Sequence, residues 1–201
     1  MKKKLKLVTI RHGLTTFNAT RTISGWVDVP LSDKGIKELQ ELKKTINYPI
    51  TDRYYSSDLS RAIDTFDILF GESQSLDGVY EAFREINFGG FDEKPIEPNA
   101  DIFYNHFLKD ESRLNAESMS MFVDRVWTQI FELLDSLVEN HLSSMTIVSH
   151  AGTTRMITFI LRQMPLNEYR SIEVGNGRGY VFDIEYDPET QKVNLIKERK
   201  L

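Results

Sequence analysis

Apolar residues form two kinds of pattern along the chain. Short continuous runs rich in β-branched or aromatic residues occur at Leu5–Ile10, Asp52–Ser56 and Met145–Ser149, and each run predicts a strand. Tyr180–Tyr186 and Val193–Ile196 predict two further strands, joined by a turn at residues 187–188. The predicted strands are therefore spread over the whole length of the chain.

Between the strands, apolar residues recur at intervals of three and four, which predicts amphipathic helices. The first helix is expected to start after Ser32 as its N-cap and to reach Ile46; the others pass through Leu59–Leu69, Phe122–Leu137 and about Thr153–Gln163. Gly71 occupies the expected C′ position after the second helix. Because strands alternate with helices, we expect a three-layer α/β sandwich with a mostly parallel central sheet flanked by helices.

The stretch from about residue 77 to residue 116 is less regular. It contains Gly89, Gly90, Pro95 and Pro98, which interrupt regular structure. No repeat, low-complexity tract or linker divides the chain elsewhere. The expected organisation is one domain over residues 1–201, with residues about 77–116 as an insertion that covers the substrate.

Composition excludes several function classes. The 201 residues are 40% hydrophobic and 27% charged, as in ordinary globular proteins, and include no cysteine. That absence excludes disulfide scaffolds, thiolate catalysis, zinc fingers and cysteine-ligated iron–sulfur clusters. A net charge of −5 argues against nucleic acid as the main partner. The apolar run behind the basic residues 2–6 is too short for a signal peptide, and no segment approaches the roughly 20 apolar residues of a membrane span, so we expect a cytoplasmic protein without membrane contact.

Two histidines occupy matching positions in the pattern. His12 follows the strand at Leu5–Ile10, and His150 follows the strand at Met145–Ser149; each comes after one polar residue and before a glycine-containing helix start. Ligands of open α/β sheets bind beyond the carboxyl ends of the strands, close to helix N-termini. If the two strands are neighbours, both imidazoles face one pocket. His106 and His141 lack this setting and are interpreted as loop and helix-end residues.

Two arginines accompany the histidines. Arg11 directly precedes His12, and Arg61 lies in the first turn of the helix that follows the strand at Asp52–Ser56. Guanidinium groups match the oxygens of a phosphate dianion. Two arginines, two histidines and helix-terminal amides therefore indicate a phosphate site.

Six ordered blocks of residues resemble the histidine phosphatase superfamily, which includes the cofactor-dependent phosphoglycerate mutases. Residues 11–18 (RHGLTTFN) resemble its Arg-His-Gly-x-Thr-x-x-Asn signature. Residues 24–35, 56–65, 83–89, 117–125 and 148–152 resemble the blocks that follow, in the same order, and the match extends over about residues 5–165.

The resemblance implies a covalent phosphohistidine mechanism without metal or cofactor. By analogy His12 is the nucleophile, while Arg11, Arg61 and His150 hold the phosphoryl oxygens. The acid position of the family falls on Glu85, although Glu81, Asp92 and Glu93 are close enough in sequence to be alternatives. Asn18 would add a phosphate contact, and Ser24 and Gly25 would lie along the path of the substrate. Trp26 is interpreted as a core aromatic, and the alternative for Arg125 is an ordinary surface or salt-bridge residue.

Departures from the family pattern favour hydrolysis over the mutase reaction. Ile86 and Phe88 replace an arginine and a tyrosine that mutases carry after the acid. The stretch between Glu85 and Glu117 is short and supplies only the cations Lys94, Lys109 and Arg113. We therefore expect a phosphomonoesterase acting on a small phosphorylated metabolite. The first alternative is mutase activity, and the second is a non-catalytic phosphate-binding module. A third is a metallohydrolase, but the sequence lacks the close spacing of metal ligands that such enzymes use.

Neither the substrate nor the oligomeric state follows from the sequence. One aromatic cluster has two interpretations: Phe103, Tyr104 and Phe107 either line a pocket for an apolar group or form the buried face of a helix. Their spacing of three and four favours the buried face.

Overall fold

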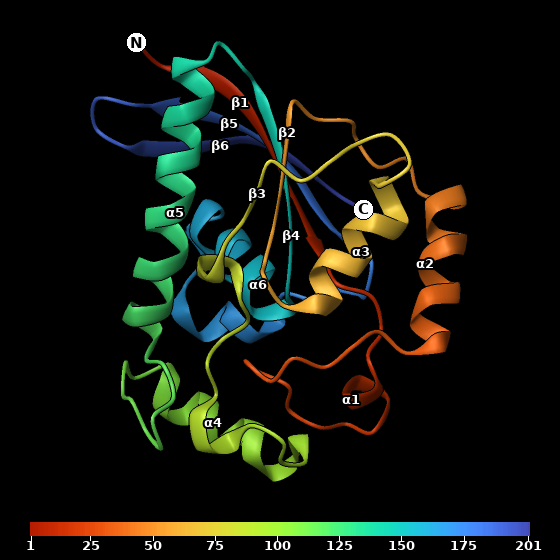
Figure 1. The fold of residues 1–201 in the computed structure, drawn as a ribbon. Coiled ribbons are helices and arrows are strands. Elements are labelled where there is room, and N and C mark those ends of the chain that lie inside the picture. The colour runs from red at the N-terminus through yellow and green to blue at the C-terminus, as the bar shows by residue number, and fades with distance from the viewer.

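A computed structural model describes residues 1–201 and contains one six-stranded sheet (Figure 1). Its strands lie in the order β3-β2-β4-β1-β5-β6. The strands are β1 (Lys3–Arg11), β2 (Arg53–Ser56), β3 (Gly78–Val79), β4 (Ser144–Ser149), β5 (Gly179–Asp187) and β6 (Lys192–Lys200). The first four strands are parallel to one another, and β5 and β6 complete one side in antiparallel orientation.

β1 and β4 are hydrogen-bonded neighbours, which is the condition under which His12 and His150 face one site. Their register pairs Arg11 with Ser149, so both strands end at the same level of the sheet. His12 and His150 are the next residues on the two strands, and the backbone N–H of His12 donates to the Ser149 carbonyl at 2.8 Å. The topology therefore places the two imidazoles side by side.

Helices cover both faces of the sheet (Figure 1). α2 (Asp33–Thr45) and α3 (Ser60–Phe70) bury one face through a 13-residue apolar cluster. α5 (Met119–Glu139) and α6 (Ala151–Leu161) cover the other face, within a 30-residue cluster. α1 (Thr16–Ala19) and α4 (Ile96–Phe107) lie beyond the carboxyl ends of the parallel strands. The predicted three-layer α/β architecture is confirmed.

Serine caps explain where two of the helices begin. Ser32 Oγ accepts the Gly35 N–H at 3.0 Å, which confirms Ser32 as the N-cap of α2. Ser118 caps α5 in the same way through the N–H of Met121. Along α5 the apolar residues return with helical period and are buried, including Phe122, Val126 and Ile130.

The segment over residues 77–116 combines a sheet edge with short helices. It contains β3, two 3₁₀ turns, η1 (Glu81–Phe83) and η2 (Gly89–Phe91), and helix α4. A third 3₁₀ segment, η3 (Leu166–Ser171), follows α6. None of the helices combines the length and the apolar character needed to cross a bilayer.

Candidate active site

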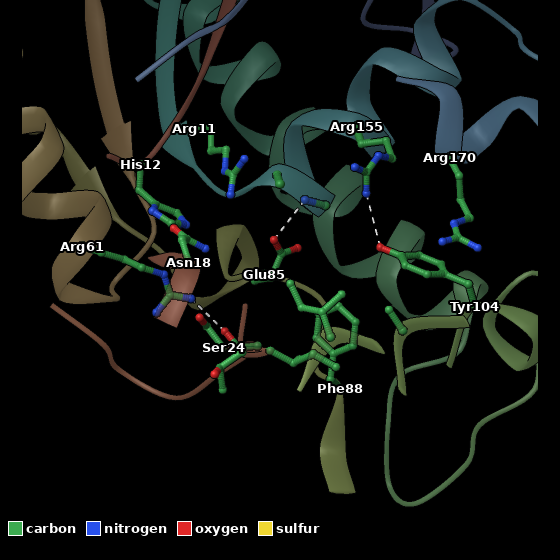
Figure 2. Close-up of a pocket in the computed structure, with 17 residues that line it drawn as sticks. Arg11, His12, Asn18, Ser24, Arg61, Glu85, Phe88, Tyr104, Arg155 and Arg170 are labelled. Atoms are coloured by element: carbon green, nitrogen blue, oxygen red, sulfur yellow. Dashed lines mark hydrogen bonds between the residues drawn. The ribbon is translucent and has the colours of Figure 1, made fainter. Parts of the chain in front are cut away.

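The carboxyl ends of β1 and β4 open into a pocket of about 360 Å³. Figure 2 shows its lining side chains converging from the strand ends, from α6 and from the segment containing α4. Of the eight residues predicted for the site, seven line this pocket: Arg11, His12, Asn18, Ser24, Gly25, Arg61 and Glu85. The eighth, His150, is fully buried beside His12, with ring centroids 5.1 Å apart.

Hydrogen bonding determines which nitrogen of His12 is available for chemistry. Its Nδ1 lies 2.7 Å from the carbonyl oxygen of Gly13. Because a carbonyl only accepts, Nδ1 carries the proton in the neutral ring and Nε2 keeps its lone pair. Gly13 is itself held by its N–H, which donates to Thr65 Oγ1 at 2.9 Å. These two hydrogen bonds fix the orientation of the ring and therefore the direction in which Nε2 points.

The surroundings of His12 favour the neutral imidazole. Burial lowers its pKa well below the usual 6.5, and the neighbouring guanidinium groups of Arg61 and Arg11 lower it further. His12 is therefore uncharged at neutral pH, which is the state in which an imidazole acts as a nucleophile.

Arg61 enters from the first turn of α3 and is held by the loop before that helix. Its Nη1 donates to the Val27 carbonyl and its Nη2 to the Gly25 carbonyl, both at 2.8 Å, while Nε donates to Nδ1 of His150 at 3.3 Å. Three contacts use three of the five N–H groups of the guanidinium. The remaining two are free in a side chain that lines the pocket.

Arg11 is the second guanidinium beside His12. Its Nη1 donates to the Val174 carbonyl at 2.7 Å, and its Nε is buried without a partner. Burial lowers the pKa of Arg11 to about 10, partly offset by the attraction of Glu85, and it remains charged at neutral pH. A buried charged donor with no acceptor is costly for a protein unless a ligand supplies one.

His150 has both ring nitrogens engaged. Nδ1 accepts from Arg61, so the proton of the neutral ring is on Nε2, which donates to Ser57 Oγ at 2.9 Å. Burial, followed by the charge of Arg61, lowers the pKa of His150 well below 6.5. In this structure the ring contacts Arg61 and Ser57 and does not line the pocket. Direct contact between His150 and a phosphoryl oxygen stays a prediction.

Glu85 reaches the pocket from the loop between η1 and η2. Its Oε1 accepts the Ile86 N–H at 2.9 Å and its Oε2 accepts the Gly152 N–H at 3.0 Å, at the start of α6. A Cβ atom at Gly152 would lie 2.0 Å from Oε1, so only glycine admits the carboxylate there. Figure 2 shows Glu85 between the arginines of the pocket.

The alternative acids lie elsewhere. The Glu81 side chain is 72% exposed and pairs with Arg84, and Glu93 is exposed as well. Asp92 is placed behind Gly25, with Oδ1 buried and without a partner. Burial raises its pKa to about 7, against the lowering effect of a hydrogen bond from the Trp26 backbone. None of these three lines the pocket, which favours Glu85.

The remaining predicted contacts come from the loop between β1 and α2. Asn18 closes a capping box with Thr15 at the start of α1, and its Oδ1 lies 3.4 Å from Nδ2 of Asn176. Gly25 adopts a φ of +44°, which favours glycine, and presents its carbonyl to Arg61. Ser24 precedes it at the pocket wall.

Two residues outside the pocket hold Glu85 in place. Trp26 is half-buried, and its Nε1 donates to the Glu85 carbonyl at 2.8 Å. Arg125 on α5 donates to the same carbonyl at 3.1 Å and pairs with Glu117 at 2.8 Å. The salt bridge expected of Arg125 is present. The expectation of a core aromatic at Trp26 is wrong, because Trp26 belongs to neither apolar cluster and lies against the guanidinium groups of Arg84 and Arg125.

Sequence reasoning missed three polar residues of the pocket, Thr22, Arg155 and Arg170, and favoured the buried alternative for Tyr104. Arg155 follows Ala151 by four residues and so shares its face of α6, a spacing from which it could have been found. Arg170 lies in η3 and carries no such signal. In the aromatic cluster Phe103 and Phe107 are buried in the core, as their spacing favours, but Tyr104 lines the pocket.

Comparison with known proteins identifies the family. The model of the histidine phosphatase superfamily, branch 1, matches residues 7–198. The chain belongs to the histidine phosphatase superfamily. It is similar to a 2,3-bisphosphoglycerate-dependent phosphoglycerate mutase from Lactobacillus acidophilus, 41% identical over 237 aligned positions that cover 98% of each chain.

Solved structures of phosphatases have the same fold as this superfamily member. A phosphoserine phosphatase variant from Entamoeba histolytica in complex with phosphoserine is 27% identical, with a TM-score of 0.71 and coverage of 96% of each chain. A mycobacterial glucosyl-3-phosphoglycerate phosphatase in complex with VO3 is 22% identical, with a TM-score of 0.78 and coverage of 97% of this chain and 98% of that one. Superfamily members are phosphatases or mutases, so membership supports catalytic phosphoryl transfer.

Proposed function

We propose that this chain is a metal-independent phosphomonoesterase that forms a phosphohistidine at Nε2 of His12. The observation that carries the proposal is the state of that imidazole: neutral, fixed by its Nδ1–H bond to Gly13, and facing the pocket beside the guanidinium groups of Arg11 and Arg61. Fixed positive charge beside a neutral nucleophile suits attack on a phosphate monoester dianion.

In the first step Nε2 of His12 attacks phosphorus and the bond from phosphorus to the alcohol oxygen breaks. Arg11 and Arg61 stabilise the charge on the transferring oxygens with the N–H groups that the protein leaves free. Glu85, in its carboxylic acid form, donates its proton to the leaving oxygen, so the alcohol departs neutral. The products are the free alcohol, phosphohistidine and the Glu85 carboxylate.

In the second step water attacks the phosphohistidine. The Glu85 carboxylate accepts a proton from the water as its oxygen bonds to phosphorus, and the bond to Nε2 breaks. Inorganic phosphate leaves, and both His12 and Glu85 return to their starting states. His150 contributes by keeping Nε of Arg61 in place and thereby supports the charge on the phosphoryl group.

The size of the pocket favours a small substrate. A volume of about 360 Å³ is near the lower end of the range for small-molecule sites. Residues 77–116 supply Glu85, Phe88, Ile96, Ala100 and Tyr104 to the lining, which supports their role as an insertion that covers the substrate within one domain.

Mutase activity is the second candidate, and the 41% identity to a curated mutase favours it. Two observations favour hydrolysis instead. Because this chain has 201 residues, the 237-position alignment contains at least 36 positions that it lacks. In addition, Lys94, Lys109 and Arg113 do not line the pocket, so the segment between Glu85 and Glu117 supplies it with no cation.

The test is hydrolysis of p-nitrophenyl phosphate with and without chelator, by the intact chain, His12→Ala and the matched control His106→Gln. We expect chelator-resistant turnover in the intact chain and the control, an acid-labile phosphoenzyme, and loss of both in His12→Ala. Turnover that persists in His12→Ala contradicts the assigned nucleophile. With 3-phosphoglycerate and a trace of 2,3-bisphosphoglycerate, phosphate release supports the phosphatase, and accumulation of 2-phosphoglycerate without phosphate release supports the mutase.

A further inference from the structure

The pocket carries more positive charge than one phosphate group requires. Its charged lining residues are four arginines and one glutamate, a surplus of three positive charges with Glu85 as the carboxylate and of four with Glu85 as the acid. A phosphate monoester dianion offsets two of them. The four arginines form two groups (Figure 2). Arg11 and Arg61 lie beside His12. Arg155 and Arg170, from α6 and η3, lie on the other side of Glu85.

Arg155 is held rigidly by uncharged partners. Its Nε donates to the Ile172 carbonyl at 3.1 Å, its Nη1 donates to Tyr104 Oη at 3.2 Å, and its guanidinium lies 5.7 Å from the Tyr169 ring centroid. Its charge lowers the pKa of Arg11, so the two guanidinium groups repel each other. An anion between them removes that repulsion.

Arg170 and Tyr104 complete the same region. The Arg170 guanidinium stacks on the Tyr104 ring at 4.8 Å and pairs with Asp101, whose side chain is 66% exposed. Tyr104 Oη accepts from Arg155, which leaves its own proton to donate, and burial raises the pKa of Tyr104 so that this proton is retained. Three donor groups therefore meet at one end of the pocket.

Between the two charged ends lies Glu85 (Figure 2). Phe88, Ile96 and Ala100 add apolar surface to the lining of the pocket, which offers contact to a carbon skeleton. The pocket thus presents a cationic end at His12, a second cationic end at Arg155 and Arg170, and apolar surface for the part of a ligand that joins them.

We propose that Arg155, Arg170 and Tyr104 form a second anion subsite, which selects phosphomonoesters whose alcohol portion ends in a carboxylate or a second phosphate. This inference rests on the proposed function for the orientation of the ligand, with its scissile phosphate at His12. Arg155 and Arg170 act in it as specificity-determining residues that do not touch the reacting atoms.

Binding of non-hydrolysable phosphonates tests the subsite separately from catalysis. The probes are propylphosphonate, 3-phosphonopropanoate and propane-1,3-diylbisphosphonate, which share three carbons and differ only at the far end. By calorimetry on the intact chain, we expect both doubly anionic probes to bind at least about tenfold more tightly than propylphosphonate, the usual scale of a charge-assisted pair. The tighter of the two identifies carboxylate or phosphate as the preferred group.

Arg170→Met is the deciding variant, because its half-exposed side chain can be removed without opening the core. It should lose most of the preference between the probes, and Tyr104→Phe should lose part of it. Arg162→Met is the matched control: Arg162 also stacks on a tyrosine ring, that of Tyr180, and pairs with a glutamate, but lies outside the pocket. The control should keep the full preference.

Two results overturn the proposal: equal affinity of the intact chain for all three probes, or a preference that Arg170→Met leaves unchanged. Failure of the proposed function has a different signature, namely no hydrolysis of p-nitrophenyl phosphate and no phosphoenzyme, whatever the phosphonates do. Preference for the doubly anionic probes together with absent hydrolysis would support the subsite while contradicting the phosphatase.

Discussion

At the scale of single residues, burial and hydrogen bonding decide which atoms of the site are free to react. The proton of His12 is fixed on Nδ1 by the Gly13 carbonyl, and burial keeps the ring neutral. Arg11 has a buried Nε without an acceptor. The unpaired Arg11 donor costs free energy, and a phosphate dianion bound beside His12 would supply its acceptor.

The role of Glu85 as proton donor leads to a prediction that depends on the leaving group. In Glu85→Gln, hydrolysis of an alkyl phosphate should fall by about 10²–10⁴, because the alkoxide then leaves without a proton. Hydrolysis of p-nitrophenyl phosphate should fall much less, since p-nitrophenolate is a stable anion. Steady-state kinetics on both substrates measures the difference, with Glu81→Gln as the exposed control; an equal loss on both substrates would contradict general acid catalysis by Glu85.

Several residues of the site could be predicted because their signal is local. Arg11, His12 and His150 directly follow recognisable strands, and neighbouring parallel strands must bring their ends together. Arg170 could not be predicted, because its position in the pocket depends on how η3 packs against α4. Arg155 could have been found from its spacing to Ala151, but its bond to Tyr104, across 51 positions of the sequence, depends on tertiary packing.

At the scale of elements, the loop that carries Glu85 is held by α5, a helix that is distant from it in the sequence. Arg125 on α5 donates to the carbonyls of Ala82 and Glu85 and pairs with Glu117, whose side chain is 8% exposed. A half-satisfied buried ion pair is strongly destabilising. The long helix therefore determines the geometry of the acid without touching the pocket.

Removing Arg125 should affect stability and catalysis separately. Arg125→Met should lower the free energy of unfolding by about 3–5 kcal/mol, because the buried Glu117 carboxylate loses its partner, and it should lower kcat because the Glu85 loop is released. The double variant Arg125→Met/Glu117→Gln should recover part of the stability but not kcat. Urea unfolding and steady-state kinetics provide the two measurements; full recovery of kcat would show that the loop does not depend on Arg125.

Sequence patterns predicted the elements better than their ends. α6 begins at Ala151 rather than near Thr153, because His150 already serves as its N-cap. Gly71 ends α3 at the C-cap with a φ of −60°, so the expected left-handed glycine at C′ is absent. β6 extends over Lys192–Lys200, well beyond the predicted Val193–Ile196, because pairing with β5 extends a strand whose ends are polar.

At the scale of the whole molecule, the two site histidines and Asp92 give opposite pH dependences of stability. The lowered pKa values of His12 and His150 mean that the unfolded chain binds more protons below about pH 6.5, so their contribution is lost as the pH falls. The pKa of Asp92 is raised to about 7, so the folded chain holds that proton and its contribution is lost as the pH rises through 7.

Asp92→Asn should isolate the second effect. Between pH 5.5 and 8 the intact chain should lose at most about 2 kcal/mol of stability through Asp92, at 1.36 kcal/mol per pH unit over the range up to its pKa, and less to the extent that solvent screens this partly exposed carboxyl. The variant should lack this loss, since an amide does not ionise, while the histidine contribution is the same in both proteins. Urea unfolding at several pH values measures the difference, with the exposed Asp124→Asn as control. Identical pH profiles of Asp92→Asn and the intact chain would contradict a raised pKa.

The position of β1 in the sheet has a consequence for biosynthesis. β1 is made before its two neighbours, since Lys6 pairs with Ser144 on one side and with Asp183 on the other. The nucleophile that follows β1 therefore has no site until β4 and β5 have left the ribosome. Throughout that delay an apolar strand has two unpaired edges, which is the situation in which nascent chains aggregate. The lysines at positions 2, 3, 4 and 6 place like charges along the start of the strand, and this repulsion protects it until its partners arrive.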